Sequence, residues 1–163
     1  MHILIKDKYL YFRKYKVKCA VGKRGIGHKR KEGDYITPIG IFKIKFILYR
    51  KDRIKKFRTS LKKISINKNF VWCYDPYSKS YNKLIKYPFE GSAEKLFRKD
   101  NIYDLIIVLN YNMNPVKKNK GSAIFIHISK RNYKKTEGCV AIRKKELLKI
   151  IINLKKKTTV KIS

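Results

Sequence analysis

Acidic residues are scarce in this chain of 163 residues: 11 Asp and Glu stand against 43 Lys and Arg, and the formal net charge is +32. Such a surplus predicts association with a polyanion, whether nucleic acid, an anionic membrane or an acidic wall polymer. The lysines are scattered, however, whereas nucleic-acid binders concentrate basic residues on one face or in a tail. A/T-rich codons would also produce the abundant Lys, Ile, Asn and Tyr. We therefore expect non-specific polyanion binding at low salt and no specific nucleic-acid partner.

Cysteine is also rare, with three residues, as is histidine. Three cysteines do not make a disulfide framework, and the odd number leaves at least one thiol free. No C-x-x-C or H-x-x-x-H spacing occurs, so we expect no zinc. The glycine-rich segment 22–40 lacks the G-x-x-x-x-G-K-[ST] pattern of a phosphate-binding loop. We expect neither a metal nor a cofactor, and we expect His28, among lysines in this segment, to be solvated.

Long apolar runs are missing too. No segment reaches the roughly 18 apolar residues of a membrane span, so no membrane span is expected. The N-terminal stretch MHILIKDKYLYF is not typical of a secretory signal, because charged residues at 6–8 interrupt it and no small-residue cleavage site follows. This leaves the cytoplasm open as a location, as well as a signal removed from the sequence or a gene start placed too late.

What the chain does contain favours a packed, mainly β fold. Hydrophobic residues make up 44% of it, and Tyr, Phe and β-branched residues are frequent. We expect a single domain over residues 1–163, mainly β with a few short helices (α+β). The patterns predict strands at 3–5, 9–12, 16–22, 41–50, 70–73, 103–112, 123–128 and 158–163, a hairpin or edge strand within 51–66, and helices at 92–100 and 143–154.

One cysteine has the surroundings of a nucleophile. Cys19 lies in an alternating strand, where a buried core thiol is expected, and Cys73 ends a strand beside Trp72. Cys139 follows Gly138, where the chain can turn sharply and free N–H groups could face an oxyanion. A base is also needed, and a strand–loop–strand return would bring His127 beside Cys139. On this spacing alone, an alternative remains: His127 is a core histidine whose hydrogen bonds are satisfied within the fold, and Cys139 is a small buried residue.

The segment HISKRNYKKTEGCVAI resembles the signature of the L,D-transpeptidase catalytic domain, the YkuD-type fold, with its strand histidine followed by Ser/Thr-x-Gly-Cys. Further blocks resemble the same family in the same order, over roughly positions 17 to 152: GKRGIGHKRKEGDYITPIGIF, WCYDP, YDLIIVLNYN and GSAIFIHI. The form T-E-G-C-V-A resembles a subgroup of that family. The resemblance implies a YkuD-type, β-sandwich-like catalytic domain.

The resemblance also implies a chemistry. Cys139 would attack the L,D-peptide carbonyl of a peptidoglycan stem peptide, with His127 as proton acceptor and donor. Gly138 and the Cys139 amide would form the oxyanion site, and Thr136 would order the loop. The resemblance further implies that the protein is located in the cell envelope or periplasm.

Two positions depart from the commoner signature. Glu137 stands where that signature has histidine, and Ala141 stands where it has an arginine that helps to hold an anionic substrate. That role could pass to Lys130, Arg131, Arg143 or a lysine of the early loop. The polar residues Asp75, Tyr81 and Asn82 are candidates for substrate binding on a loop over the site, with ordinary turn chemistry as the alternative.

Three functions follow from these observations. The leading one is acyl transfer on wall peptides through a Cys139 thioester, that is, an L,D-transpeptidase. The second is an L,D-carboxypeptidase or another amidase that uses the same Cys–His site. The third, from a different class, is a non-catalytic basic module that binds an anionic polymer.

Overall fold

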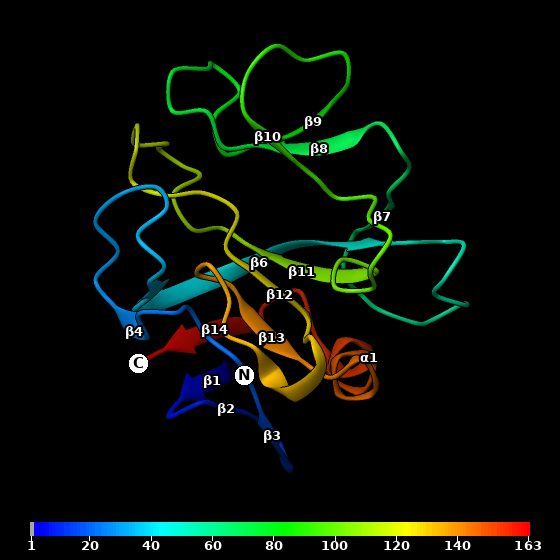
Figure 1. Ribbon diagram of the computed structural model, residues 1–163. Coiled ribbons are helices and arrows are strands. Elements are labelled where there is room, and N and C mark those ends of the chain that lie inside the picture. Colours follow the sequence, from blue (N-terminus) through cyan, green and yellow to red (C-terminus); the bar gives the residue numbers. More distant parts are fainter. Residues whose placement is uncertain (1) are drawn as a thin grey trace.

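The computed structural model describes residues 2–163, and its main feature is a large sheet (Figure 1). The strands run in the order β13-β12-β11-β6-β14-β1-β2-β3, and β7 pairs with β6 away from that path. Their bounds are β1 His2–Lys6, β2 Tyr9–Phe12, β3 Tyr15–Lys18, β6 Gly40–Tyr49, β7 Lys63–Ser65, β11 Leu105–Leu109, β12 Phe125–Ile128, β13 Val140–Ile142 and β14 Thr159–Ile162. The predicted mainly β fold class is confirmed.

Two smaller sheets accompany the large one. One has the order β10-β8-β9 and the other pairs β4 with β5. Their strands are β4 Ile26–Gly27, β5 Thr37–Pro38, β8 Phe70–Cys73, β9 Leu84–Lys86 and β10 Ala93–Lys95. In Figure 1 the three-stranded sheet lies above the large sheet, while the first strands of the chain, β1 to β3, lie at the opposite end.

The prediction of a helix at 92–100 is wrong. Residues 93–95 form β10, which pairs antiparallel with β8. Ser92 would suit the cap of such a helix and Glu94 its first turn, but the Glu94 carboxylate accepts a hydrogen bond from the Tyr103 hydroxyl at 2.8 Å. Tertiary pairing with β8 therefore overrides the local helix signal, which was short and lacked a long apolar stripe.

The central strand β6 serves two hydrophobic clusters because its pairing with β11 is irregular. The register shifts between Val108 and Leu109, which pair with Phe46 and Ile44. A bulge of this kind shifts the alternation of side chains by one residue, so that residues on its two sides can point to opposite faces of the sheet. Ile44 thus belongs to the cluster shared with β1, β12 and the helix, whereas Leu48 belongs to the cluster around Trp72.

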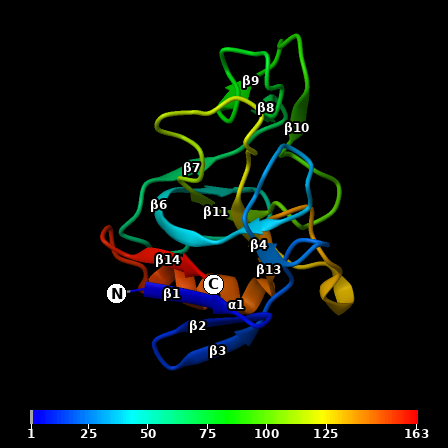
Figure 2. The ribbon, with the colours of Figure 1, turned by 90° about the vertical axis from the view of Figure 1, so that its left-hand side faces the viewer.

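The helix α1, Lys144–Asn153, closes one side of the fold beside β12 (Figures 1 and 2). It buries Leu147, Ile150 and Ile151, which share one face at helical spacing. This agrees with the predicted helix at 143–154. A short 3-10 turn, η1 Arg131–Tyr133, lies in the connection between β12 and β13.

Other expectations are confirmed with changes in detail. The basic segment 51–66 supplies β7, an edge strand that pairs parallel with β6 rather than forming a hairpin. The strand expected at 16–22 is shorter, but Cys19 is buried as predicted. β12 and β13 are neighbours in the sheet, and they run parallel.

Candidate active site

His127 and Cys139 lie on the same face of two neighbouring strands. In the parallel pairing of β12 with β13, His127 is opposite Ala141 and Ile126 is opposite Val140. Side chains alternate along a strand, and Ile126 and Val140 both point into the first cluster. Their neighbours along the chain, His127 and Cys139, therefore point to the other face, where Cys139 packs against the cluster around Trp72.

The Cys139 thiol is held by backbone atoms at the start of β12. Its Sγ–H donates to the Ala123 carbonyl at 3.0 Å, and the Phe125 N–H donates to Sγ at 3.4 Å. The side chain is half-buried, whereas Cys19 and Cys73 are fully buried. Cys139 is therefore the most accessible of the three thiols, although it rests in a hydrogen-bonded position.

The segment before Cys139 is fixed by threonine hydroxyls. The Thr136 hydroxyl donates to the Cys139 carbonyl at 2.5 Å and accepts from the Gly138 N–H at 3.2 Å. The Thr37 hydroxyl reaches the same carbonyl at 3.4 Å. Within residues 2–163 the Cys139 N–H has no hydrogen-bond partner, so this N–H is the available donor for an oxyanion.

Gly138 is required by the backbone at this turn. Its φ is +141°, a region that L side chains rarely adopt, and a Cβ there would stand 3.0 Å from the Ile36 carbonyl oxygen. The chain can pass from Thr136 to Cys139 beside the early loop only because this residue has no side chain.

Burial keeps the two reactive groups neutral. Desolvation raises the pKa of the Cys139 thiol to about 12, against the lowering effects of the Phe125 N–H and of the Lys29 charge. Desolvation also lowers the pKa of His127 to about 4. A thiol and a neutral imidazole therefore make up the resting pair at neutral pH, and a thiolate could form here only if a base accepted the proton of the thiol.

One ring nitrogen of His127 is engaged in a hydrogen bond to the backbone. Its Nδ1 lies 2.9 Å from the Ile128 carbonyl oxygen, and because a carbonyl only accepts, Nδ1 carries the proton. Nε2 is then the unprotonated nitrogen that can act as a base. Tyr103 packs edge-on against the ring with centroids 5.2 Å apart, which fixes the orientation of the imidazole.

Tyr81 and Asn82 support the strand that carries the site and are themselves buried. Asn82 accepts from the Ala123 N–H at 3.0 Å and from the Trp72 indole at 3.1 Å. The Tyr81 hydroxyl accepts from the Gly121 N–H at 3.0 Å and donates to Glu32. Both residues thus fix the segment 121–123, whose Ala123 carbonyl receives the Cys139 thiol.

The other predicted substrate-binding residues are not brought to Cys139. Asp75 accepts from the Tyr77 N–H at 2.9 Å, which is turn chemistry. Arg131 and Arg143 are exposed, and both follow the ends of β12 and β13, whereas Cys139 precedes β13. Arg143 is four residues beyond Cys139 in extended chain, about 13 Å at 3.3 Å per residue. Glu137, which replaces the expected histidine, is exposed.

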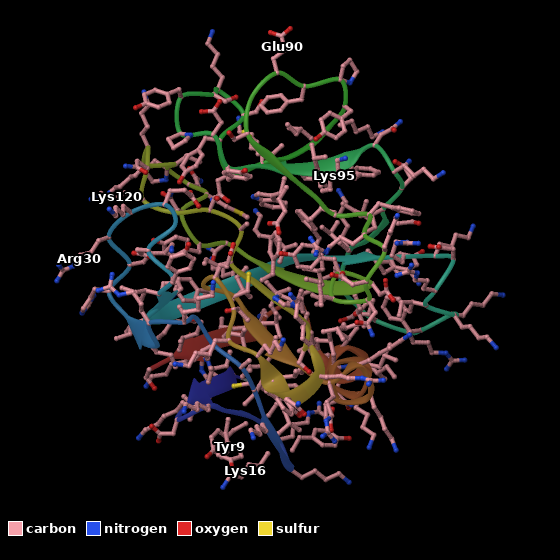
Figure 3. The ribbon with its side chains drawn as sticks, viewed as in Figure 1. Tyr9, Lys16, Arg30, Glu90, Lys95 and Lys120 are labelled. Atoms are coloured by element: carbon pink, nitrogen blue, oxygen red, sulfur yellow. The ribbon has the colours of Figure 1, made fainter. Side chains whose placement is uncertain are left out.

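The loop at 28–36 has a role at the site that was not predicted from the sequence. Asp34 is buried, and its carboxylate accepts from Lys29 and from the N–H groups of Arg30, Lys31 and Ile36. This loop lies beside the segment before β12, because the Glu32 N–H donates to the Asn119 carbonyl at 3.1 Å. Figure 3 shows Arg30 and Lys120 pointing outward on the same side. In the sequence, the adjacent Gly33 and Asp34 of the segment GKRGIGHKRKEGDYITPIGIF were the signal that could have indicated this role.

A hollow opens on the outer side of the same loop. Its volume is about 440 Å³, and it is lined by Arg24, His28, Arg30, Lys31, Asp34 and Ile36. The Ile36 carbonyl faces Gly138, so the hollow and the Cys139 turn share one loop. Its lining is mainly basic, which suits an anionic group.

The site thus contains a half-buried cysteine after a glycine turn, on the same sheet face as a strand histidine. A sequence model of the YkuD family, the L,D-transpeptidase catalytic domain, matches residues 2–162. The chain belongs to this family, whose members act on peptidoglycan. A search among curated proteins finds no match.

Two further observations concern residues 2–163. No helix in this part of the chain is long and apolar enough to cross a membrane. Nor do three or more His, Cys, Asp or Glu side chains gather there in a way that could hold a metal ion.

Proposed function

We propose that this protein is an L,D-transpeptidase that transfers a peptidoglycan stem peptide through a thioester on Cys139. The observation that supports it best is the placement of His127 and Cys139 on one face of two neighbouring parallel strands, with the family match over residues 2–162. The single-domain organisation over residues 1–163 and a location in the cell envelope belong to the same proposal.

The first half-reaction forms the thioester. The thiol leaves its hydrogen bond to the Ala123 carbonyl, His127 Nε2 takes its proton, and Sγ forms a bond to the substrate carbonyl carbon. The Cys139 N–H donates to the oxyanion of the tetrahedral intermediate. Collapse breaks the peptide C–N bond, and the imidazolium returns the proton to the departing amine.

The second half-reaction releases the acyl group. The amine of a second stem attacks the thioester carbonyl, His127 accepts a proton from that amine, and the C–S bond breaks. Reprotonation of the sulfur by the imidazolium restores the starting thiol and neutral base. Water in place of the amine gives hydrolysis, that is, the carboxypeptidase alternative, with the same residues.

Acylation by a carbapenem, followed by intact-mass spectrometry, tests the proposal. We expect one adduct on the native chain, the same adduct on Cys73→Ala, and none on Cys139→Ala. Thermal melting should show that all three proteins are folded. An adduct that persists on Cys139→Ala would disprove the assignment of the nucleophile. Absence of any adduct would favour the non-catalytic, polymer-binding alternative.

Product analysis separates transfer from hydrolysis. A tetrapeptide stem is incubated with a second amine acceptor, and the products are identified by mass. We expect the cross-linked product with native protein and its loss with His127→Asn. Release of the terminal residue without cross-linking, at any acceptor concentration, would indicate the carboxypeptidase.

A further inference from the structure

Lys29 lies buried between two glycines of the candidate active site. Its side chain is 3% exposed. A Cβ built on Gly121 would stand 2.3 Å from Lys29 Cε, and one built on Gly138 would stand 3.7 Å from Lys29 Nζ. The lysine stem thus occupies the space left by Gly121, and the ammonium group reaches the turn that precedes Cys139.

The ammonium group is held in place by a buried carboxylate. Lys29 Nζ is 2.5 Å from Asp34 Oδ1, and the Asp34 side chain is also 3% exposed. Three backbone N–H groups, those of Arg30, Lys31 and Ile36, share the charge of that carboxylate. Although burial raises the pKa of Asp34, the hydrogen bond from Lys29 and, after it, those from the three N–H groups lower this pKa to about 2. The three N–H groups also interact with the Asp34 carboxylate. Asp34 therefore cancels only part of the positive charge of Lys29 at the Cys139 turn.

No cation stands two residues after Cys139, where the commoner signature has an arginine, because Ala141 occupies that position. Ala141 has no charge, it is 1% exposed, and its N–H and carbonyl are both bonded to Ala20. Arg131 and Arg143 are exposed beyond the far ends of the strands. Burial raises the pKa of the Cys139 thiol, and so do the charges of Glu94 and Glu137, whereas the charge of Lys29 lowers it.

We propose that Lys29, positioned by Asp34, is the cation of this active site, which stabilises negative charge on the Cys139 sulfur and on the oxyanion beside Gly138. The role in catalysis rests on the proposed function. The electrostatic effect on the thiol does not, because it can be measured without a substrate.

The test is the rate at which iodoacetamide alkylates Cys139, measured by mass spectrometry of the Cys139 peptide between pH 7 and 9.5. The double variant Lys29→Met/Asp34→Asn removes both charges and leaves no unpaired buried ion. Opposite charges within about 4–6 Å move a pKa by one to three units, and Asp34 offsets part of that here, so we expect alkylation about three- to tenfold slower at every pH. Lys23→Met, an exposed lysine of the same segment, is the matched control and should react at the native rate.

The direction of the change separates this role from a structural one. If the pair only supported the loop, its removal would loosen the turn and expose the thiol, and alkylation would be as fast as in the native chain or faster. Either of these results for the folded double variant would overturn the proposal. Failure of the carbapenem test with slower alkylation in the double variant would count against the proposed function and leave the electrostatic assignment standing.

Discussion

At the scale of single residues, the site is built from groups that the fold keeps uncharged. His127 is 6% exposed, and desolvation lowers its pKa to about 4. The folded protein therefore binds fewer protons at this position than the unfolded chain, in which histidine titrates near 6.5. The neutral base that the proposed mechanism needs has a cost in stability at acid pH.

We predict that the free energy of unfolding falls as the pH drops from about 6.5 to 4. In this range the unfolded state binds a proton on His127, whereas the buried imidazole of the folded state stays neutral. A shift of this size corresponds to about 3 kcal/mol. Burial raises the pKa of Glu94, whose protonation offsets part of this loss, while Asp34, with a folded-state pKa of about 2, adds to the loss only below about pH 5, where its carboxyl in the unfolded chain begins to bind protons. Denaturant unfolding across this range measures the effect.

Comparison of variants isolates the histidine. His127→Asn keeps a donor for the Ile128 carbonyl and does not titrate, so its stability should depend less on pH than that of the native chain. His28→Asn, at an exposed loop position, should follow the native curve. Equal pH dependence in His127→Asn and the native chain would show that another group causes the loss.

At the scale of elements, the turn before β13 decides where the nucleophile stands. Thr136 and Thr37 fix the Cys139 carbonyl, and Gly138 lets the turn approach the Ile36 carbonyl. The early loop and the Cys139 turn are therefore one packed unit, although the two are about a hundred residues apart in sequence.

Gly138→Ala should destabilise the protein by about 1–3 kcal/mol, because the new Cβ meets both an unfavourable φ and the Ile36 carbonyl. It should also abolish carbapenem acylation, since the turn has to shift. Gly33→Ala is the matched control: φ is +69° there, but nothing lies within 4 Å of the new Cβ. We expect that variant to be destabilised by about 1 kcal/mol and to be acylated normally. A Gly138→Ala protein as stable as Gly33→Ala would contradict the tight contact.

At the scale of the whole molecule, the positive charge is spread rather than focused. Among residues 2–163 the ion pairs are Lys29–Asp34, Arg50–Asp52, Arg53–Asp104 and Arg98–Asp100, so most basic side chains have no acidic partner. Figure 3 shows nitrogen-tipped side chains on several sides of the molecule, with Lys16 at one end and Arg30 and Lys120 along one side, while Glu90 lies at the opposite end. A surface of this kind attracts polyanions without selecting a sequence.

We predict that the protein binds DNA in dilute salt and releases it near physiological ionic strength, because non-specific phosphate contacts weaken by orders of magnitude over that range. Thioester formation on Cys139 should change much less, since a small substrate meets few of the charges at short range. A salt titration of both on one preparation measures this. Sequence-selective DNA binding that persists at roughly 0.2 M salt would contradict the enzyme assignment.

The sequence by itself predicted most strands of the large sheet, and it indicated a candidate nucleophile and a candidate base. Alternating and continuous apolar runs predicted β1, β2, β6, β11, β12 and β14 because the period of two follows directly from strand geometry. The glycine before Cys139 and the histidine within a buried strand were likewise visible as local patterns, and the resemblance of several ordered blocks indicated the family.

Only the tertiary structure decided which distant groups surround those residues. Segment 93–95 became a strand because β8 offered a partner for pairing, which its local signal could not report. Tyr81 and Asn82, polar residues of a loop, became buried supports of residues 121–123. Lys29, one basic residue among 43, became the buried cation beside Gly138 because Asp34 and the bare backbone of Gly121 make room for it. Such long-range contacts depend on the packing of the whole chain, and no local pattern encodes them.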